Sequence, residues 1–316
     1  MNEPRISVII PNYNHGQFLP RCLTALLQQS VPPSEIIVVD DASTDNSMAV
    51  LNSFAQQHPI LRVYSNERNA GVHLSMNRGL GLAQCDYVFF AAADDEVRPG
   101  LFEHSVRMLR AHPQAGLCSG MCEWRCVRTG LAWHMGAGMP RQPCYLAPAE
   151  MVSLSQDGRL AIFGPTAVYK KSALVEAGAW IPELRWFCDF FGSYVVGFRY
   201  GICHVPEVLA TFNLHPTSYY HSARSRAERR VVMKRILQFL DSQKYADVKP
   251  LMVESGILGS FGWPMFQVML RRRKYWGYLT GSFARRALRR CAEVVGRQFI
   301  PIWLARFCLK VFYGLR

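Results

Sequence analysis

Two pairs of adjacent aspartates in this sequence each follow a strongly apolar segment. Asp40 and Asp41 come directly after an Ile-Ile-Val-Val run, and Asp94 and Asp95 come after a Tyr-Val-Phe-Phe run and three alanines. In an open parallel sheet, ligands bind at the edge formed by the carboxyl ends of the strands. Neighbouring carboxylates raise each other's energy unless a cation or hydrogen-bond donors compensate. The two doublets therefore predict one acidic pocket, suited to a metal-bound, sugar-bearing nucleotide.

The first hundred residues, which must position these acids, alternate between strand and helix patterns. Apolar runs predict strands at residues 6–10, 36–39, 61–64 and 87–90. Between them, apolar residues recur at helical spacing, which predicts helices that begin near residues 17, 45 and 71. Strands separated by helices imply crossover units and a parallel sheet. The predicted fold is α/β, with a Rossmann-like, mostly parallel sheet flanked by helices.

The pattern loosens from about residue 115 to residue 170. Gly, Pro, Met and Trp residues between 133 and 148 predict a long irregular segment, and loops of that length are usually functional or disordered. Regular structure is predicted again beyond this segment. A strand is expected at 166–169, and helices at 171–177, 184–198 and 222–241.

Charge is distributed unevenly along the 316 residues. The net charge is +13, but residues 1–220 carry 16 basic and 18 acidic side chains, a net charge of −2. Residues 221–316 carry 20 basic and 5 acidic side chains, a net charge of +15. Such asymmetry indicates an anionic partner for the C-terminal part, either membrane phospholipid or nucleic acid. Nucleic acid is disfavoured, because no recognisable binding motif accompanies the charge.

The C-terminal segment has the pattern of a basic amphipathic helix between residues 283 and 299. One helical stripe is apolar, and arginines fall largely opposite it. The stripe consists of Phe283, Ala287, Leu288, Cys291, Val294, Val295 and Phe299. Aromatic residues surround it on both sides, among them Trp263, Trp276, Tyr278, Trp303, Phe307, Phe312 and Tyr313. This pattern is typical of a helix that lies in an anionic membrane surface; the alternative is a helix packed on the rest of the protein.

The cysteines and the N-terminus indicate the compartment. The ten cysteines are scattered, and the chain has neither the small size nor the secretory context typical of a disulfide framework. Cys118, Cys122 and Cys126 recur every four residues, but no partner cluster with zinc-type spacing follows them. The apolar run at residues 6–10 is too short for a signal peptide. No uncharged apolar segment approaches the ~20 residues that span a bilayer. We expect a reduced cytoplasmic protein, peripheral on the inner face of the cell membrane.

Four short motifs occur in order over about 90 residues. They are ISVIIPNYN (6–14), VVDDASTD (38–45), NAG with NRG (69–71 and 77–79) and ADD (93–95). Together they resemble glycosyltransferase family 2, and weaker family features continue to about residue 220. The resemblance implies the nucleotide-diphospho-sugar-binding fold called GT-A, transfer of a sugar with inversion at the anomeric carbon, and the use of Mg²⁺ or Mn²⁺.

The resemblance also assigns roles on the donor side. Asp41 matches the acid that accepts the imide N–H of a uracil, and Pro11 and Tyr13 match the wall beside the base and ribose. Asp94 matches the residue that hydrogen-bonds the ribose, and Asp95 matches the metal ligand. A hard divalent cation is typically held by one or two carboxylates plus substrate phosphates. The expected partner is therefore a nucleotide-sugar donor.

Asp40 and Ala92 stand apart from this assignment. Asp40 is expected only to cap the turn that follows its strand. Ala92 occupies a position where many family members have a further aspartate. Both acids of the doublet after it are retained, so the expectation of metal binding stands.

An inverting transfer needs a general base for the acceptor hydroxyl. Asp189 matches the family's aspartate for this role, although Cys188 replaces the glutamate that often precedes it. Aromatic neighbours on both sides are expected to raise the pKa of Asp189 toward the range useful for a base. His215 matches a basic or imidazole group that faces the diphosphate, where it would ligate the metal or pair with a phosphate. Capping or surface placement of Asp189, and a structural role for His215, remain alternatives.

The predicted organisation is a GT-A catalytic domain at 1–220 and a basic helical extension at 221–316. The predicted activity is metal-dependent, inverting transfer of a sugar from a nucleotide-sugar, UDP-linked by the Asp41 match, to a cell-surface glycan or lipid-linked acceptor. One alternative is a catalytically silent nucleotide-sugar-binding or membrane scaffold protein, favoured by Cys188 and Ala92. A nucleotidyltransferase would need a glycine- and lysine-rich loop, but residues 11–16 hold one glycine and no lysine.

Overall fold

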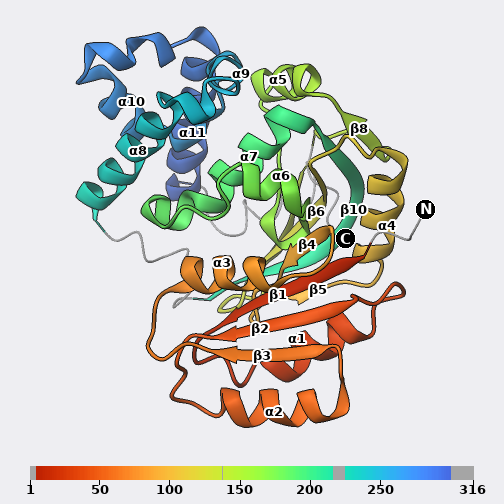
Figure 1. Ribbon diagram of the computed structural model, residues 1–316. Helices are drawn as coiled ribbons and strands as arrows, with labels where there is room; N and C mark the ends of the chain where they lie inside the picture. Colours follow the sequence, from red (N-terminus) through yellow and green to blue (C-terminus); the bar gives the residue numbers. More distant parts are fainter. Residues whose placement is uncertain (1–4, 137, 216–224, 300–316) are drawn as a thin grey trace.

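A single mixed sheet runs through the computed structural model, which describes residues 5–136, 138–215 and 225–299 (Figure 1). The described residues form ten strands in the order β3-β2-β1-β4-β9-β6-β10-β5, with β7 paired to β6 and β8 to β10. The strands are β1 (Ile6–Asn12), β2 (Glu35–Asp40), β3 (Leu61–Ser65), β4 (Tyr87–Phe90), β5 (Glu96–Val97), β6 (Leu117–Cys126), β7 (Ala132–Met135), β8 (Cys144–Leu146), β9 (Val168–Lys170) and β10 (Ile202–Leu214).

The first four strands confirm the predicted parallel sheet. β1 pairs in parallel with β2 and β4, and β2 pairs in parallel with β3. Successive side chains of a strand point to opposite faces, so Ile9 belongs to one hydrophobic core and Val8 to the other. A strand that is buried on both faces needs a continuous apolar run. This explains why β1, β2 and β4 could be predicted from continuous apolar segments. β3 is an edge strand in which only Leu61 is buried, and its segment is mixed.

Helices cover both faces of the sheet, as predicted (Figure 1). On one face, α1, α2 and α4 pack against the core that contains Val8; the other face carries α3 and most of the later helices. The helices are α1 (Leu19–Leu27), α2 (Ser47–Gln57), α3 (Val72–Leu82), α4 (Leu101–Ala111), α5 (Pro148–Gln156), α6 (Lys171–Glu176), α7 (Cys188–Tyr200), α8 (Arg226–Leu240), α9 (Lys249–Glu254), α10 (Trp263–Leu270) and α11 (Gly281–Phe299). Short 3-10 helices are η1 (Gly164–Thr166), η2 (Pro182–Phe187), η4 (Gln243–Tyr245), η5 (Ile257–Phe261) and η6 (Arg273–Tyr278).

The prediction of a long irregular segment at 133–148 was wrong. β7 pairs antiparallel with β6, and β8 pairs antiparallel with β10. The longest strand, β10, was not predicted either. It runs parallel to β6, with register shifts between Val205 and Ala210. These strands depend on partners far along the chain, and pairing of this kind leaves little periodicity in the sequence.

The predicted helix at 184–198 is two elements. η2 ends at Phe187 and α7 begins at Cys188, because Arg185 adopts a positive φ of 47° that an α-helix does not allow. The break places Asp189 in the first turn of α7. The predicted helices at 171–177 and 222–241 are confirmed as α6 and α8.

The C-terminal helices share a core with the rest of the protein. Phe283 and Ala287 on α11 are 2% and 9% exposed, and they pack with Ile257 and Leu258 of η5. The expectation that this stripe faces a membrane is therefore wrong for these two residues. Stripe residues from 294 onward and the aromatics beyond 299 lie outside the described side chains, and the expected domain boundary near 220 lies in the undescribed 216–224.

Within the described residues, no helix is both long enough and apolar enough to cross a bilayer.

Candidate active site

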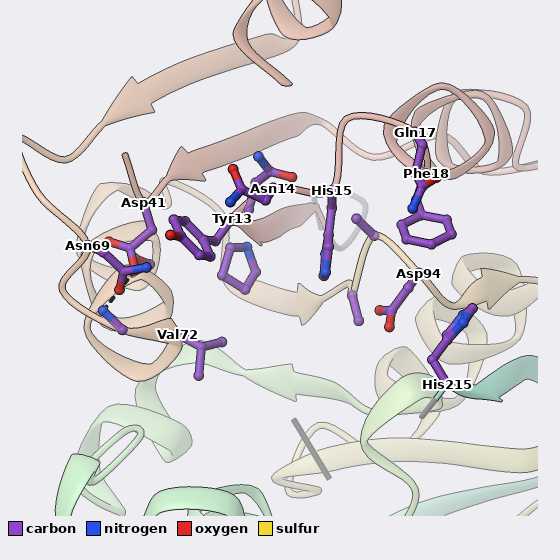
Figure 2. Close-up of a pocket in the computed structure, with 16 residues that line it drawn as sticks. Tyr13, Asn14, His15, Gln17, Phe18, Asp41, Asn69, Val72, Asp94 and His215 are labelled. Carbon is purple, nitrogen blue, oxygen red and sulfur yellow. Dashed lines mark hydrogen bonds between the residues drawn. The ribbon is translucent and has the colours of Figure 1, made fainter. Parts of the chain in front are cut away.

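A cavity of about 730 Å³ opens at the carboxyl ends of β1, β2 and β4 (Figure 2). Its walls come from the loop between β1 and α1, the turn after β2, the start of α3, the turn after β4 and the end of β10. The lining residues are Pro11, Asn12, Tyr13, Asn14, His15, Gln17, Phe18, Asp41, Asn69, Gly71, Val72, Ser75, Ala92, Ala93, Asp94 and His215. Five residues that the sequence singled out therefore share one cavity: Pro11, Tyr13, Asp41, Asp94 and His215.

Asp41 lies at one end of this cavity and is held as a carboxylate. It accepts hydrogen bonds from the backbone N–H of Ala70 at 2.9 Å and of Gly71 at 2.8 Å, and from the Asn66 side chain at 2.6 Å. Burial raises the pKa of Asp41, but these hydrogen bonds outweigh it and bring the pKa below the ordinary value. Gly71 has a φ of 94°, which strongly favours glycine, and it leads the chain into α3 with its N–H toward Asp41.

Asp40 points away from the cavity and holds the turn after β2. Its carboxylate accepts from the Asn12 side chain at 2.7 Å, and from the Ser43 hydroxyl at 2.6 Å and backbone N–H at 3.0 Å. The neighbouring Asn14 connects the same turn to β1, because its side-chain oxygen accepts from the Thr44 N–H at 2.7 Å. The expected capping role of Asp40 agrees with these contacts.

The second doublet is divided in the same way. The Asp94 side chain lines the cavity, while the Asp95 carboxylate is 7% exposed and accepts from the backbone N–H of Asn213 at 2.9 Å. Burial raises the pKa of Asp95 well above the ordinary value, and the charge of Asp94 adds to that rise. One acid of each doublet thus reaches the cavity, and the other holds the backbone.

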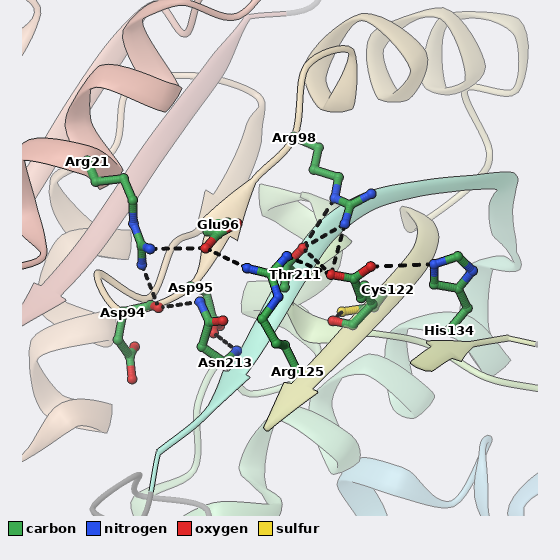
Figure 3. Close-up of polar contacts among 11 residues, drawn as sticks. Arg21, Asp94, Asp95, Glu96, Arg98, Cys122, Arg125, His134, Thr211 and Asn213 are labelled. Atoms are coloured by element: carbon green, nitrogen blue, oxygen red, sulfur yellow. Dashed lines mark hydrogen bonds and ion pairs between the residues drawn. The ribbon is translucent and has the colours of Figure 1, made fainter. Parts of the chain in front are cut away.

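Two side chains fix the main chain of Asp94 from different directions (Figure 3). Its carbonyl oxygen accepts from Arg21 at 3.2 Å and from the Asn213 side chain at 2.9 Å. Arg21 also pairs with Glu96 at 3.0 Å, and Arg125 pairs with the same Glu96 at 3.1 Å. The acidic turn after β4 is therefore tied to α1, β6 and β10 together.

Sequence reasoning missed these positioning residues. Arg21 and Glu96 are 75 residues apart, and Asn213 and Asp94 are 119 residues apart. No local pattern reports a pair at such separations. The one available signal was the place of Asn213, two residues before the candidate His215.

His215 stands at the other end of the cavity from Asp41. Its ring packs against Phe18, with centroids 5.4 Å apart, and Figure 2 shows the imidazole on the same side of the cavity as the Asp94 carboxylate. Tyr13, which is 44% exposed, projects into the space between the two ends. Among the described residues, no three His, Cys, Asp or Glu side chains come together as a metal-binding cluster.

Asp189 does not line this cavity. Asp189 as a residue is exposed to solvent. The surrounding protein atoms nevertheless desolvate its carboxyl group and raise the pKa of that group above the ordinary value, as expected. Its flanking residues Phe187 and Phe190 pack on Phe261 of η5, with ring centroids 4.5 Å and 4.8 Å apart. The position facing it is Gly164, where an added Cβ would lie 3.8 Å from Asp189 Oδ2.

Two further arginines, Arg78 and Arg199, and the described cysteines lie outside the cavity. Arg78 donates to the Ser65 carbonyl at 2.7 Å, and Arg199 pairs with Asp247 at 2.7 Å. The nine cysteines within the described residues form no disulfide, and Cys118 and Cys122 are buried in β6. These groups support the fold and carry no contact with the cavity.

Comparison with known proteins agrees with this geometry. The profile of the family described as "Glycosyl transferase family 2" matches residues 7–174. An uncharacterized glycosyltransferase, alr2836, from a Nostoc species is 34% identical over 225 residues, which cover 70% of this chain and 68% of the relative. The uncharacterized glycosyltransferase YibD of Escherichia coli is 36% identical over 131 residues, which cover 41% of this chain but only 37% of the relative.

Solved structures share the fold at low sequence identity. TarS of S. aureus (residues 1–349) superposes with a TM-score of 0.59 and 17% identity, over 92% of this chain and 80% of TarS. The mannosyltransferase PcManGT of Pyrobaculum calidifontis, solved with GDP-Man and Mn²⁺, superposes with a TM-score of 0.58 and 18% identity, over 99% of this chain and 87% of that enzyme. With its profile match, its relatives and its GT-A fold, this chain belongs to glycosyl transferase family 2.

Proposed function

We propose that this chain transfers a sugar, with inversion at the anomeric carbon, from a UDP-linked donor to a cell-surface glycan or lipid-linked acceptor. One observation carries the proposal. A single cavity has the Asp41 carboxylate, suited to a nucleobase, at one end and the Asp94 carboxylate with the His215 imidazole at the other. Pro11 and Tyr13 also line it. TarS, which shares the fold, has been solved in complex with UDP-GlcNAc, which supports a nucleotide-sugar donor.

The Asp41 end is assigned to the base of the nucleotide. Asp41 is held ionised by hydrogen bonds from the protein backbone, and a buried carboxylate is a strong acceptor for the imide N–H of uracil. Pro11 and Tyr13 supply apolar surface beside the base and ribose. Guanine can also donate to a carboxylate, through its N1–H and amino group, so the donor screen below includes GDP-sugars.

The Asp94 end is assigned to the ribose, the diphosphate and a divalent cation, Mg²⁺ or Mn²⁺. Asp94 and His215 fit such an ion, because Mn²⁺ accepts carboxylate and imidazole ligands and substrate phosphates complete its shell. The ion supplies charge neutralisation for the departing diphosphate. This reassigns the metal-facing acid from Asp95 to Asp94, because the Asp95 carboxylate is buried against Asn213.

Asp189 is assigned as the general base that takes the proton of the acceptor hydroxyl. Its raised pKa brings it closer to the range in which a base is effective near neutral pH. Its open surface and the small Gly164 opposite leave room for an acceptor. The aromatic side chains around it offer apolar faces on which a sugar ring can pack.

The expected division of labour along the chain is retained as part of the proposal. Residues 1–220 bind the donor and carry the chemistry, and residues 221–316 form a helical extension at the inner face of the cell membrane. The shared hydrophobic core makes the two parts one folded body. The extension therefore acts as a fixed platform on the catalytic part.

A donor screen tests the proposal directly. The full chain is incubated with UDP-, GDP- and dTDP-sugars in Mn²⁺ or in excess chelator, and both thermal stabilisation and release of nucleoside diphosphate are measured. We expect stabilisation and slow release with one UDP-sugar, lost in chelator. Stabilisation without any release, even with candidate acceptors, would instead support a silent binding protein, and full activity in chelator would overturn the metal assignment.

A further inference from the structure

Three large apolar side chains are exposed on α10 and the segment after it. Trp263, Leu270 and Trp276 are 56%, 52% and 48% exposed. Trp263 and Leu270 are seven residues apart and so lie on one side of the helix. Trp276 is fixed next to them, because its indole N–H donates to the Leu270 carbonyl at 3.1 Å. We call this surface, together with the basic run 271–274, the α10 face.

Basic side chains surround the apolar part of the α10 face. Arg271, Arg272, Arg273 and Lys274 are all exposed, and the Arg273 guanidinium lies 5.6 Å from the Trp276 ring centroid. At the other end of the helix, Trp263 borders a recess of about 350 Å³ whose other lining residues are Arg226, Arg229, Arg230, Pro264 and Gln267. Residues 255–292 contain eight basic and no acidic side chains.

The arginines of α11 that point inward serve the fold instead. Arg286 donates to the Ser155 carbonyl at 2.8 Å, and Arg289 donates to the Asp157 carbonyl at 2.8 Å. Phe283 and Ala287 bury one side of the described part of α11, while Arg285 and Leu288 on the same helix are exposed. Exposed tryptophan, leucine and arginine side chains occur together on α10 and η6.

We infer that the α10 face docks on an anionic phospholipid bilayer. Tryptophan prefers the interface between headgroups and acyl chains, where its ring is apolar and its N–H is wet. Arginine and lysine beside it are attracted to anionic headgroups. The α10 face has both features, and the segment that forms it contains no acidic residue. Its apolar and basic side chains are therefore complementary to the interior and the headgroups of an anionic bilayer.

The α10 face is directly connected to the acceptor side of the proposed reaction. Phe261, two residues before Trp263, packs on Phe187 and Phe190 around Asp189. A bilayer that contacts α10 would therefore lie near the segment that carries the candidate base, Asp189. This part of the inference rests on the proposed function, and it favours a lipid-linked acceptor over a soluble glycan.

Vesicle binding by the full chain tests the inference. Co-sedimentation is measured with vesicles of phosphatidylcholine alone and with phosphatidylglycerol added. The charge variant carries Arg271→Gln, Arg272→Gln and Arg273→Gln; its matched control carries Gln at three exposed arginines of the main body, Arg110, Arg128 and Arg141. The apolar variant carries Ser at Trp263, Leu270 and Trp276; its control carries Ser at the exposed Val127 and Val175.

We expect binding only to vesicles with phosphatidylglycerol, weakened by salt. The charge variant should bind roughly 100-fold more weakly, since each lost charge near the surface weakens binding several-fold, and both controls should bind like the parent chain. Equal losses in variants and controls would overturn the inference. So would preferential binding to duplex DNA, or a dimer that the apolar variant abolishes while vesicle binding is absent throughout.

Donor measurements separate this inference from the proposed function. Thermal stabilisation by a UDP-sugar and slow release of UDP should be unchanged in both variants, because their positions lie outside the donor cavity. If the parent chain binds vesicles but no nucleotide-sugar, the proposed function fails and the docking surface stands. If it binds the donor but no vesicle, the docking surface fails alone.

Discussion

The donor side and the acceptor side of this protein are built in different ways. On the donor side, Asp41 receives its hydrogen bonds from residues at most 30 positions away, between the end of β3 and the start of α3. On the acceptor side, Asp189 has aromatic neighbours that pack on Phe261, from the C-terminal part of the chain. The donor half is therefore fixed by short parallel crossovers, whereas the acceptor half is fixed by packing between distant segments. This difference lets one donor cavity be combined with many acceptor surfaces in a family of this fold.

The turn after β4 joins the two sides, because Asn213 of β10 holds both Asp94 and Asp95. Its two acids give the largest expected effect and the sharpest test of the donor side. Asp94→Asn should lower turnover with Mn²⁺ about 1000-fold, since loss of a metal-facing carboxylate removes several kcal/mol of charge stabilisation. Steady-state release of UDP measures it.

Asp95→Asn is the matched control for that change. The substituted amide oxygen can still accept the Asn213 N–H, and burial already disfavours the charge of Asp95, so turnover should fall less than about tenfold. The reverse order of the two effects would return the metal to Asp95. It would also mean that the turn rearranges when donor binds.

The second prediction tests whether the acceptor side and the C-terminal helices are one body. Phe283 is 2% exposed in the shared core, so Phe283→Ala should cost about 3 kcal/mol of unfolding free energy. Chemical denaturation measures this cost. The exposed Leu288 on the same helix supplies the control, and Leu288→Ala should change stability by less than about 0.5 kcal/mol.

A single cooperative transition is expected in that experiment. Two separated transitions, with only the later one shifted by Phe283→Ala, would show that residues 221–316 fold apart from the catalytic part. The C-terminal helices would then be an independently folding unit, separate from both the donor side and the acceptor side.

The third prediction concerns the candidate base. Asp189→Asn should lower sugar transfer about 100-fold, within the range for loss of a general base, and should leave thermal stabilisation by the donor unchanged. Because the base acts only when deprotonated, the rate in the parent chain should fall as pH drops through the pKa of Asp189. Burial raises that pKa, so the fall should occur above the pH at which an ordinary aspartate is protonated.

A pH profile of turnover measures this fall in rate at acidic pH. The profile of Asp189→Asn should not show this fall. The profile of Glu183→Gln, which changes an exposed acid of the preceding η2, should show it. Unchanged turnover in the Asn variant would assign the base to another residue. The donor side would remain as described.

Much of the donor side could be predicted from the sequence because its determinants are local. A continuous apolar run before each doublet predicts a strand buried on both faces, and the doublet that follows is placed at the ligand edge. The resemblance separated Asp41 from the capping Asp40, but it placed both Asp94 and Asp95 in the pocket. Asp40 turns toward Asn12 of β1 and Ser43 of its own turn, whereas Asp95 turns toward Asn213 of β10, which is 118 residues away.

The acceptor side was predicted less well for the same reason. β7, β8 and β10 gain their stability from pairing with distant strands, and the break at Arg185 interrupts what reads as one helix. The C-terminal helix shows the clearest reversal. Of its predicted apolar stripe, Phe283 and Ala287 are buried in the protein while Leu288 is 71% exposed. Hydrophobicity along the chain alone does not distinguish a protein core from a membrane.

The sequence by itself thus determined the family, the parallel donor half, the acids available to it and the basic character of the C-terminal part. Periodicity, turn residues and charge are properties of neighbouring residues, and they can be read along the chain. Only the tertiary structure decided that Asp95 is buried, that Phe283 and Ala287 of α11 pack inside the protein, and that Trp263 and Trp276 on and beside α10 are exposed. Each of these depends on which distant surfaces meet, because a side chain is buried or exposed by its partners in space and not by its neighbours in sequence.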